Sequence, residues 1–178
     1  LGSGLANQGW KDSNDSVFHA DGSDPVGPIA LVEVQGYVFA AFLEMAEISE
    51  MRGDEDGAVA YRRRADRMRA AIEQRFWMDN RGFYAMALDG RHQLCAVRGS
   101  NAGHLLYAGV PSKTRASAVI DALLAGAFMN GWGIRTLATD EARFNPLSYH
   151  NGSVWPHDTA LIAAGMARYG ERDGVLRL

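Results

Sequence analysis

Two neighbouring segments of this chain carry different helical patterns, and this difference constrains its fold more than any other feature. Residues 29–51 follow Pro28, and their first half is apolar on every side, which is typical of a helix buried all round. Residues 55–76 carry apolar side chains at spacings of three and four with arginines between them, which is typical of an amphipathic helix. We therefore expect an inner helix that packs against an outer one.

The same alternation returns later in the chain. Turn signals surround residues 83–97 and predict a short β-hairpin. Ser100 is expected to cap a helix that ends near residue 108, and residues 111–128 predict a second helix with a single apolar stripe. Residues 156–169 predict a last buried helix. This order predicts an all-α fold, in which helical hairpins form part of a toroid with an inner and an outer ring and a small inserted β-hairpin.

Composition and charge narrow the expected partners. The 178 residues carry a formal net charge of −3 with a pI near 5.9, so no broad positive field favours nucleic acid. The arginines in residues 62–69 fit either a solvated helix face or a patch for polyanions. No apolar run is long enough to span a membrane, and Cys95 is the only cysteine. We expect a cytoplasmic protein that binds neither nucleic acid nor membrane.

Polar and aromatic side chains gather at the start of each expected inner helix. The set comprises Glu33, Gln35 and Tyr37 at the first helix, Asn101 and His104 at the second, and Tyr149, His150, Asn151, Trp155, His157 and Asp158 at the third. If these helices run parallel, their N-terminal ends meet at one mouth of the ring. Burying such groups without partners would cost about 1–3 kcal/mol each. We therefore expect a ligand pocket at this mouth.

Glu33 and Gln35 cannot both face this pocket. Residues two apart on a helix point to nearly opposite sides, whereas Glu33 and Tyr37, four apart, share a face. We expect Glu33 to face the pocket. A buried ion pair between Glu33 and an arginine such as Arg135 is the structural alternative.

Three tryptophans lie in loops rich in Gly or Asn and fit a sugar site. Trp10, Trp132 and Trp155 can each cover the apolar face of a pyranose ring, while nearby carboxylates and amides bind its hydroxyls. A packing role at the end of an element is the alternative for any one of them. Trp77 ends the second helical pattern and is expected in the core.

His150, His157 and Asp158 raise the separate hypothesis of a metal site. Their spacing matches no common ligand motif, and Pro156 interrupts it, so we expect no metal and no other cofactor. A general-base role, hydrogen bonds to a sugar and a helix cap by Asp158 stay open as alternatives.

Five stretches of the sequence together resemble a known enzyme family. In chain order they are "NQGWKDSND", "PIALVEVQGYVFAA", "SNAGHLLYAGV", "GWGIRTLA" and "NPLSYHNGSVWPHDTALIAAGMARYG". They look like the bacterial amylo-α-1,6-glucosidase family of the glycogen-debranching type. The resemblance implies an (α/α)6 toroid and an inverting glycoside hydrolase that acts on α-glucosidic bonds. It also implies that residues 1–178 are one partial catalytic domain and an internal fragment of a longer chain.

The resemblance makes Asp12 the general acid that protonates the glycosidic oxygen. Such an acid must stay protonated near neutral pH, and Asp15 is expected either to assist in this or to bind a sugar hydroxyl. Trp10, Lys11 and Arg135 belong to the expected substrate-binding set. A local turn capped by Asp12 is the structural alternative. The water-activating base of the family is expected on a later helix pair, beyond these residues.

Two other classes of function stay open. One is an epimerase or isomerase on a similar toroid that uses His104, His150 and His157, and the other is a non-catalytic carbohydrate-binding piece. The expected partners are an α-glucan or a small α-glucoside and the remainder of the parent chain. An incomplete ring leaves apolar helix flanks uncovered, so the chain by itself is expected to be inactive and to self-associate.

Overall fold

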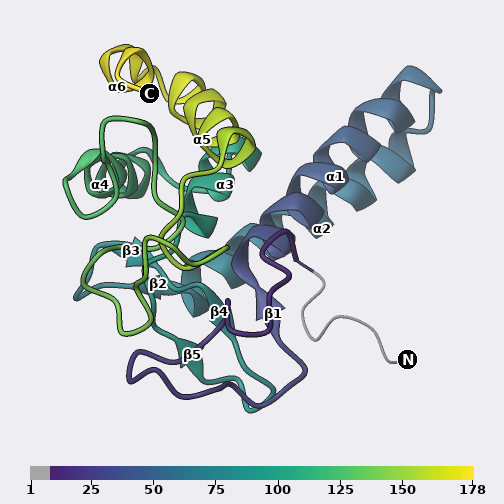
Figure 1. Cartoon of the computed structure of the whole chain (residues 1–178). Coiled ribbons are helices and arrows are strands. Elements are labelled where there is room, and N and C mark those ends of the chain that lie inside the picture. The colour runs from purple at the N-terminus through teal and green to yellow at the C-terminus, as the bar shows by residue number, and fades with distance from the viewer. Residues whose placement is uncertain (1–8) are drawn as a thin grey trace.

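The two longest helices, α1 (Val32–Met51) and α2 (Glu55–Arg75), form a helical hairpin in the computed structural model, which describes residues 9–178. The hairpin projects from the rest of the chain in Figure 1. Gly53 lies at the reversal, where its φ of 74° suits a residue without a Cβ. The Asp54 side chain then caps α2 by accepting a hydrogen bond from the Gly57 amide at 2.9 Å. The predicted helix pair is confirmed.

Four shorter helices follow, and α3 lies at their centre. They are α3 (Asn101–Ala108), α4 (Lys113–Leu124), α5 (Pro156–Arg168) and α6 (Arg172–Leu176). α3 contacts α1, α4 and α5, while α6 contacts α5 (Figure 1). Gly109 ends α3 with a φ of 76°. α4 ends four residues earlier than residue 128, and α6 is an element that the sequence patterns did not predict.

Short antiparallel strands join the helices. β1 (Ala30–Leu31), β4 (Ala87–Leu88) and β5 (Leu94–Cys95) form one sheet in the order β1-β4-β5, and β2 (Trp77–Met78) pairs with β3 (Phe83–Tyr84). β4 and β5 are the predicted hairpin.

β1 corrects the predicted start of the first helix at residue 29. Ala30 pairs with Leu88 and Leu31 with Ala87, and α1 begins only at Val32, whose amide donates to the Met86 carbonyl at 3.0 Å. The apolar pattern of residues 29–31 suits a strand as well as a helix, and pairing with β4 makes these residues a strand.

Glycines lie where α1, α3 and α5 approach one another. A Cβ on Gly36 of α1 would lie 2.7 Å from Leu105 Cδ2 on α3, and one on Gly103 of α3 would lie 2.5 Å from Ile162 Cγ1 on α5. A methyl group at either position would therefore force the facing side chain to move. Because both glycines lie in the first two turns of their helices, they keep the N-terminal ends of α1, α3 and α5 close together.

α1 is not buried all round, which corrects that expectation. In its first half, Phe39 is buried but Val34 and Tyr37 are each 37% exposed, and further along the helix Met45, Ile48 and Met51 are also exposed. One face of α1 therefore packs on the core and the other carries apolar side chains at the surface. Overall the fold is mainly α with small β-hairpins, as predicted. None of the helices in residues 9–178 combines the length and the apolar character that crossing a membrane requires.

Candidate active site

The N-terminal ends of α1, α3 and α5 meet around the buried side chain of Lys11. Its ammonium donates to Asn101 Oδ1 at 2.7 Å and to the Thr136 carbonyl oxygen at 2.6 Å. Lys11 is only 2% exposed, and burial lowers its pKa to about 8. The negative charges of Asp158 and Glu33 act in the opposite direction and favour the ammonium. A positive charge is therefore held inside the cluster of polar residues.

Glu33 and Asp158 are the buried carboxylates near Lys11. Burial raises the pKa of Glu33, although Asn101 and the charge of Lys11 favour its ionised form. The Asn101 amide is close to Glu33 but makes no hydrogen bond of good geometry with it. Within residues 9–178, neither Glu33 oxygen has a hydrogen-bond partner, and Asp158 Oδ2 has none either. Both side chains therefore have unused hydrogen-bonding capacity.

Gln35 points elsewhere, as expected from its position two residues after Glu33. Its amide donates to the Leu31 carbonyl of its own chain segment at 3.2 Å. The alternative ion pair of Glu33 with Arg135 is not formed. Arg135 instead donates to the Gly152 carbonyl at 3.2 Å, and its guanidinium lies 5.6 Å from the Phe144 ring.

His104 connects Asp158 to Tyr37. Its Nε2 lies 2.6 Å from Asp158 Oδ1, and its Nδ1 is hydrogen-bonded to the Tyr37 hydroxyl. The three residues belong to α3, α5 and α1 respectively. Asp158 and His104 are fully buried, whereas Tyr37 is 37% exposed. A chain of hydrogen bonds thus runs from the buried carboxylate to the surface.

Trp10 packs on this chain and on the aromatic residues that begin α5. Its ring stacks on His104, with centroids 5.8 Å apart and planes inclined by 12°. It contacts His150, Trp155 and His157 edge to face at centroid distances of 5.5, 6.2 and 4.8 Å. Trp10 Nε1 is buried without a partner in the described part of the chain. An aromatic wall with an unused N–H suits the apolar face and hydroxyls of a sugar.

Asp12 is half-buried and lies close enough to His150 to influence its charge. Burial and the charge of Lys11 lower the pKa of His150, while Asp12 and Asp15 act to raise it. His150 Nδ1 lies 2.8 Å from Ser13 Oγ. The segment that carries Asp12 is therefore tied to the loop that precedes α5.

Asp15 ties the same segment to that loop a second time. It is exposed, and Asn151 Nδ2 donates at 3.1 Å both to its carboxylate and to its carbonyl. Asn151 Oδ1 is buried and has no partner among the residues described. Asn7 and Gln8, which begin the first of the five sequence stretches, lie outside the described residues.

Two predicted residues lie at the border of the cluster or away from it. Tyr149 is 64% exposed, but its ring contacts His150 and Trp155 at 4.5 and 4.8 Å. Trp132 is 87% exposed and lines a separate hollow of about 500 Å³ beside α5, together with Pro156 and other residues. The structure therefore does not place Trp132 with Trp10.

The sequence analysis missed Ser13 and Thr136. Ser13 directly follows Asp12, and this adjacency was the available signal for its contact with His150. Thr136 accepts a hydrogen bond from Lys11 through its backbone carbonyl, so the identity of its side chain could not have predicted this contact. The complete burial of Lys11 was also unexpected, because lysine is rarely found inside a protein.

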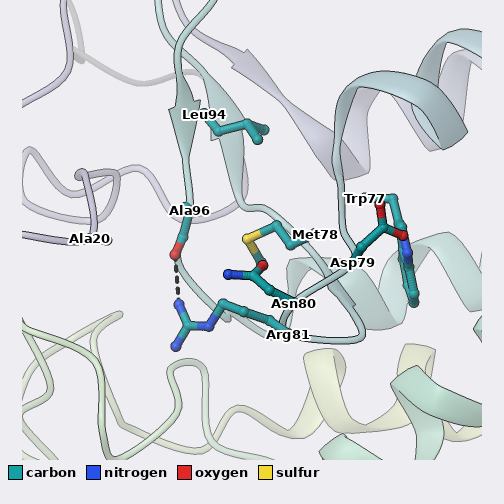
Figure 2. Close-up of a pocket in the computed structure, with 8 residues that line it drawn as sticks. All are labelled: Ala20, Trp77, Met78, Asp79, Asn80, Arg81, Leu94 and Ala96. Atoms are coloured by element: carbon teal, nitrogen blue, oxygen red, sulfur yellow. Dashed lines mark hydrogen bonds between the residues drawn. The ribbon is translucent and has the colours of Figure 1, made fainter.

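Another hollow, of about 610 Å³, lies near β2 and β5, away from the predicted site residues (Figure 2). Its lining comprises Ala20, Trp77, Met78, Asp79, Asn80, Arg81, Leu94 and Ala96. Trp77, expected in the core, is half-buried on β2 and borders this hollow. Within residues 9–178, no three or more His, Cys, Asp and Glu side chains come together in a way that could hold a metal ion.

Solved structures share this fold at low sequence identity. A sialidase matches with a TM-score of 0.79 and 18% identity, over 99% of this chain and 17% of that chain. The GH63 mannosylglycerate hydrolase from Thermus thermophilus, in complex with Tris, matches with a TM-score of 0.72 and 19% identity, over 84% and 35% of the two chains. Neutral trehalase Nth1 from Saccharomyces cerevisiae matches with a TM-score of 0.71 and 14% identity, over 80% and 28%. These likenesses support the predicted helical toroid.

The sequence comparison is more specific. Mannosylglycerate hydrolase from Rubrobacter radiotolerans is 28% identical over 156 residues, which make up 82% of this chain and 34% of that relative. The chain thus spans about a third of the length of this relative. The predicted relationship to glycoside hydrolases with an (α/α)6 toroid is confirmed, whereas a debranching specificity is not shown. Residues 5–178 match the family described as the mannosylglycerate hydrolase MGH1-like glycoside hydrolase domain, and the chain belongs to this family.

Proposed function

We propose that this chain forms part of the active site of an inverting glycoside hydrolase that cleaves a small α-glycoside of the mannosylglycerate type. The observation that carries the proposal is a group of buried polar atoms around Trp10 that have no partner within residues 9–178. They are Trp10 Nε1, both Glu33 oxygens, Asn151 Oδ1 and Asp158 Oδ2. Such atoms are rare in native structures. A ligand with several hydroxyls offers donors and acceptors to all of them.

Asp12 is the general acid in this proposal. It is half-buried, follows Trp10 and Lys11 directly in the chain, and its charge acts on His150, whose ring contacts Trp10. A general acid must reach the glycosidic oxygen and be only partly solvated, and a half-buried carboxyl at the edge of a sugar site meets both conditions.

The water-activating base is assigned to a part of the full-length protein outside these 178 residues. Inversion requires a second carboxylate about 6.5–9.5 Å from the acid, with room for a water between them. Asp158 is hydrogen-bonded to His104, and Glu141 accepts hydrogen bonds from Arg81 and Arg98. Each of these carboxylates is therefore already engaged through one oxygen by a side chain of the protein, which makes it a weaker candidate for the base than a carboxylate from outside these residues.

The relatives support the proposed substrate class. A mannosylglycerate hydrolase matches in sequence, and another matches in fold. The five sequence stretches favour an α-glucosidic linkage as the second candidate. An epimerase that uses His104 is disfavoured, because both of its ring nitrogens are occupied by Asp158 and Tyr37.

Turnover of defined substrates by the full-length protein tests this proposal. The panel comprises α-mannosylglycerate, α-glucosylglycerate, trehalose and an α-1,6-linked glucose disaccharide. We expect the glycerate glycosides to be cleaved fastest, with the sugar released first as the β-anomer, which NMR of the fresh product detects. Release of the α-anomer would contradict inversion, and no cleavage of any substrate would contradict the proposal as a whole.

A further inference from the structure

When His104 is neutral, its contacts with Asp158 and Tyr37 decide which ring nitrogen carries the proton. An imidazole that is neutral carries one N–H and one lone pair. The Asp158 carboxylate accepts hydrogen bonds only, so the ring proton is placed on Nε2, 2.6 Å from Asp158 Oδ1. Nδ1 is then an acceptor, and the Tyr37 hydroxyl must donate to it.

Tyr37 keeps its single proton in this arrangement. Burial and the negative charges of Glu33 and Asp158 raise the pKa of the phenol well above its ordinary value. Because the Tyr37 hydroxyl uses this proton in its hydrogen bond to His104, the phenol oxygen offers only lone pairs to any other partner. Within residues 9–178, His104 is its only hydrogen-bond partner, and the side chain is partly exposed.

We propose that Tyr37 is a specificity-determining residue that accepts a hydrogen bond from a sugar hydroxyl, and that His104 and Asp158 hold it in this acceptor state. This inference rests on the proposed function, because it requires a glycoside at the site. It also makes an exclusion. A group that can only accept, such as the carboxylate of a glycerate aglycone or a ring oxygen, cannot bind to Tyr37.

The position of the ring proton can be measured without any substrate. In the full-length protein labelled with ¹⁵N-histidine, nitrogen chemical shifts separate a protonated from an unprotonated Nδ1. The His104 signals are assigned from their loss in His104→Gln. We expect an unprotonated Nδ1 at neutral pH. A protonated Nδ1 would make His104 the donor and free the Tyr37 proton, and this would overturn the inference.

The substrate contact is tested with four α-mannosylglycerate analogues, each with one sugar hydroxyl replaced by fluorine. Fluorine cannot donate a hydrogen bond, so the analogue at the position facing Tyr37 loses this contact. For each analogue, kcat/KM is divided by that of the parent substrate, and this ratio is compared between the wild type and Tyr37→Phe. At one of the four positions, we expect the loss of kcat/KM caused by fluorine to be about 3- to 10-fold smaller in Tyr37→Phe than in the wild type, which is the usual effect of one hydrogen bond.

His104→Gln and Tyr61→Phe complete the design. The glutamine of His104→Gln keeps a donor for Asp158 but lacks the Nδ1 acceptor. The loss of kcat/KM caused by fluorine at the same position should therefore also be smaller in this variant. Tyr61 lies on α2, where its ring contacts Phe42, and its variant should retain the wild-type ratios. Ratios unchanged at all four positions in Tyr37→Phe, with the parent substrate still cleaved, would refute the inference alone. If no glycoside is cleaved, the proposed function and the sugar contact both fail, while the ring nitrogen shifts still decide the acceptor state.

Discussion

Two groups of charged side chains, each built around a buried carboxylate, differ in how completely the protein supplies hydrogen bonds to that carboxylate. The Lys11 cluster comprises Lys11, Glu33, His104 and Asp158, and the Glu141 cluster comprises Arg81, Arg98, Asp140 and Glu141. Glu141 Oε1 accepts hydrogen bonds from Arg81 Nη2 at 2.7 Å and from the Arg98 amide at 3.1 Å. In the Lys11 cluster, Glu33 and Asp158 Oδ2 have no partner within residues 9–178.

This difference separates a structural role from a functional one. A carboxylate that stabilises a fold is held by donors from its own chain, as Glu141 is by Arg81. Figure 2 shows Arg81, which is also hydrogen-bonded to the Ala96 carbonyl. Unpaired buried polar atoms cost free energy, and their presence in the Lys11 cluster is the observation on which we base the proposed ligand site. Substitutions in the two clusters should therefore affect different quantities.

The largest effect is expected for Asp12→Asn in the full-length protein. Loss of the general acid should lower kcat at least about a hundredfold for a substrate with a poor leaving group, while binding persists. The measurement is steady-state turnover together with binding by calorimetry. An activated leaving group should recover much of the rate, because it needs little protonation. Asp15→Asn is the matched control and should lose far less, and equal losses in both variants would count against Asp12.

Glu141→Gln should act on stability instead. It weakens hydrogen bonds to two arginines in a buried setting, so the free energy of unfolding should fall by about 1–3 kcal/mol. Urea denaturation measures this loss. Turnover by the folded fraction should stay at the wild-type value. A large fall in turnover with normal stability would place Glu141 in the catalytic machinery and remove the contrast between the clusters.

Glu33→Gln should show the reverse pattern. Its carboxylate receives no hydrogen bond from the described chain, so the free energy of unfolding should change by no more than about 0.5 kcal/mol, whereas KM for the glycoside should rise about tenfold. Thermal melting and kinetics on the same preparation test both parts. A collapse in melting temperature with normal affinity would mean that Glu33 mainly stabilises the Lys11 charge.

The smallest effect concerns the pH dependence of Lys11. Burial lowers its pKa to about 8 from an ordinary 10.5, so between these values the unfolded chain binds more protons than the folded one. Stability contributed by this group therefore rises with pH across that window, by about 1 kcal/mol for each unit of pKa difference that is crossed. Lys11→Met lacks this rise, so the wild type should gain stability relative to the variant between pH 8 and 9.5. If the difference in unfolding free energy between the wild type and Lys11→Met did not change with pH in this range, the lowered pKa of Lys11 would be contradicted.

Local pattern was enough to predict most of the helices. The helical period of residues 55–76 and the β-hairpin within residues 83–97 match α2, β4 and β5 closely. Spacing also predicted that Glu33, rather than Gln35, faces inward. These predictions depend on residues near one another in the chain, where backbone geometry fixes the direction of each side chain.

The sequence by itself determined most of the helices and the collection of polar groups at the N-terminal ends of three of them, because both follow from local geometry. Only the tertiary structure decided how these groups combine. It buried Lys11 between Asn101 and Thr136, joined Tyr37 to Asp158 through His104, and left Trp132 exposed. The physical reason is that these contacts join segments far apart in the chain. Their register depends on how closely α1, α3 and α5 pack at Gly36 and Gly103, and no local pattern encodes that distance.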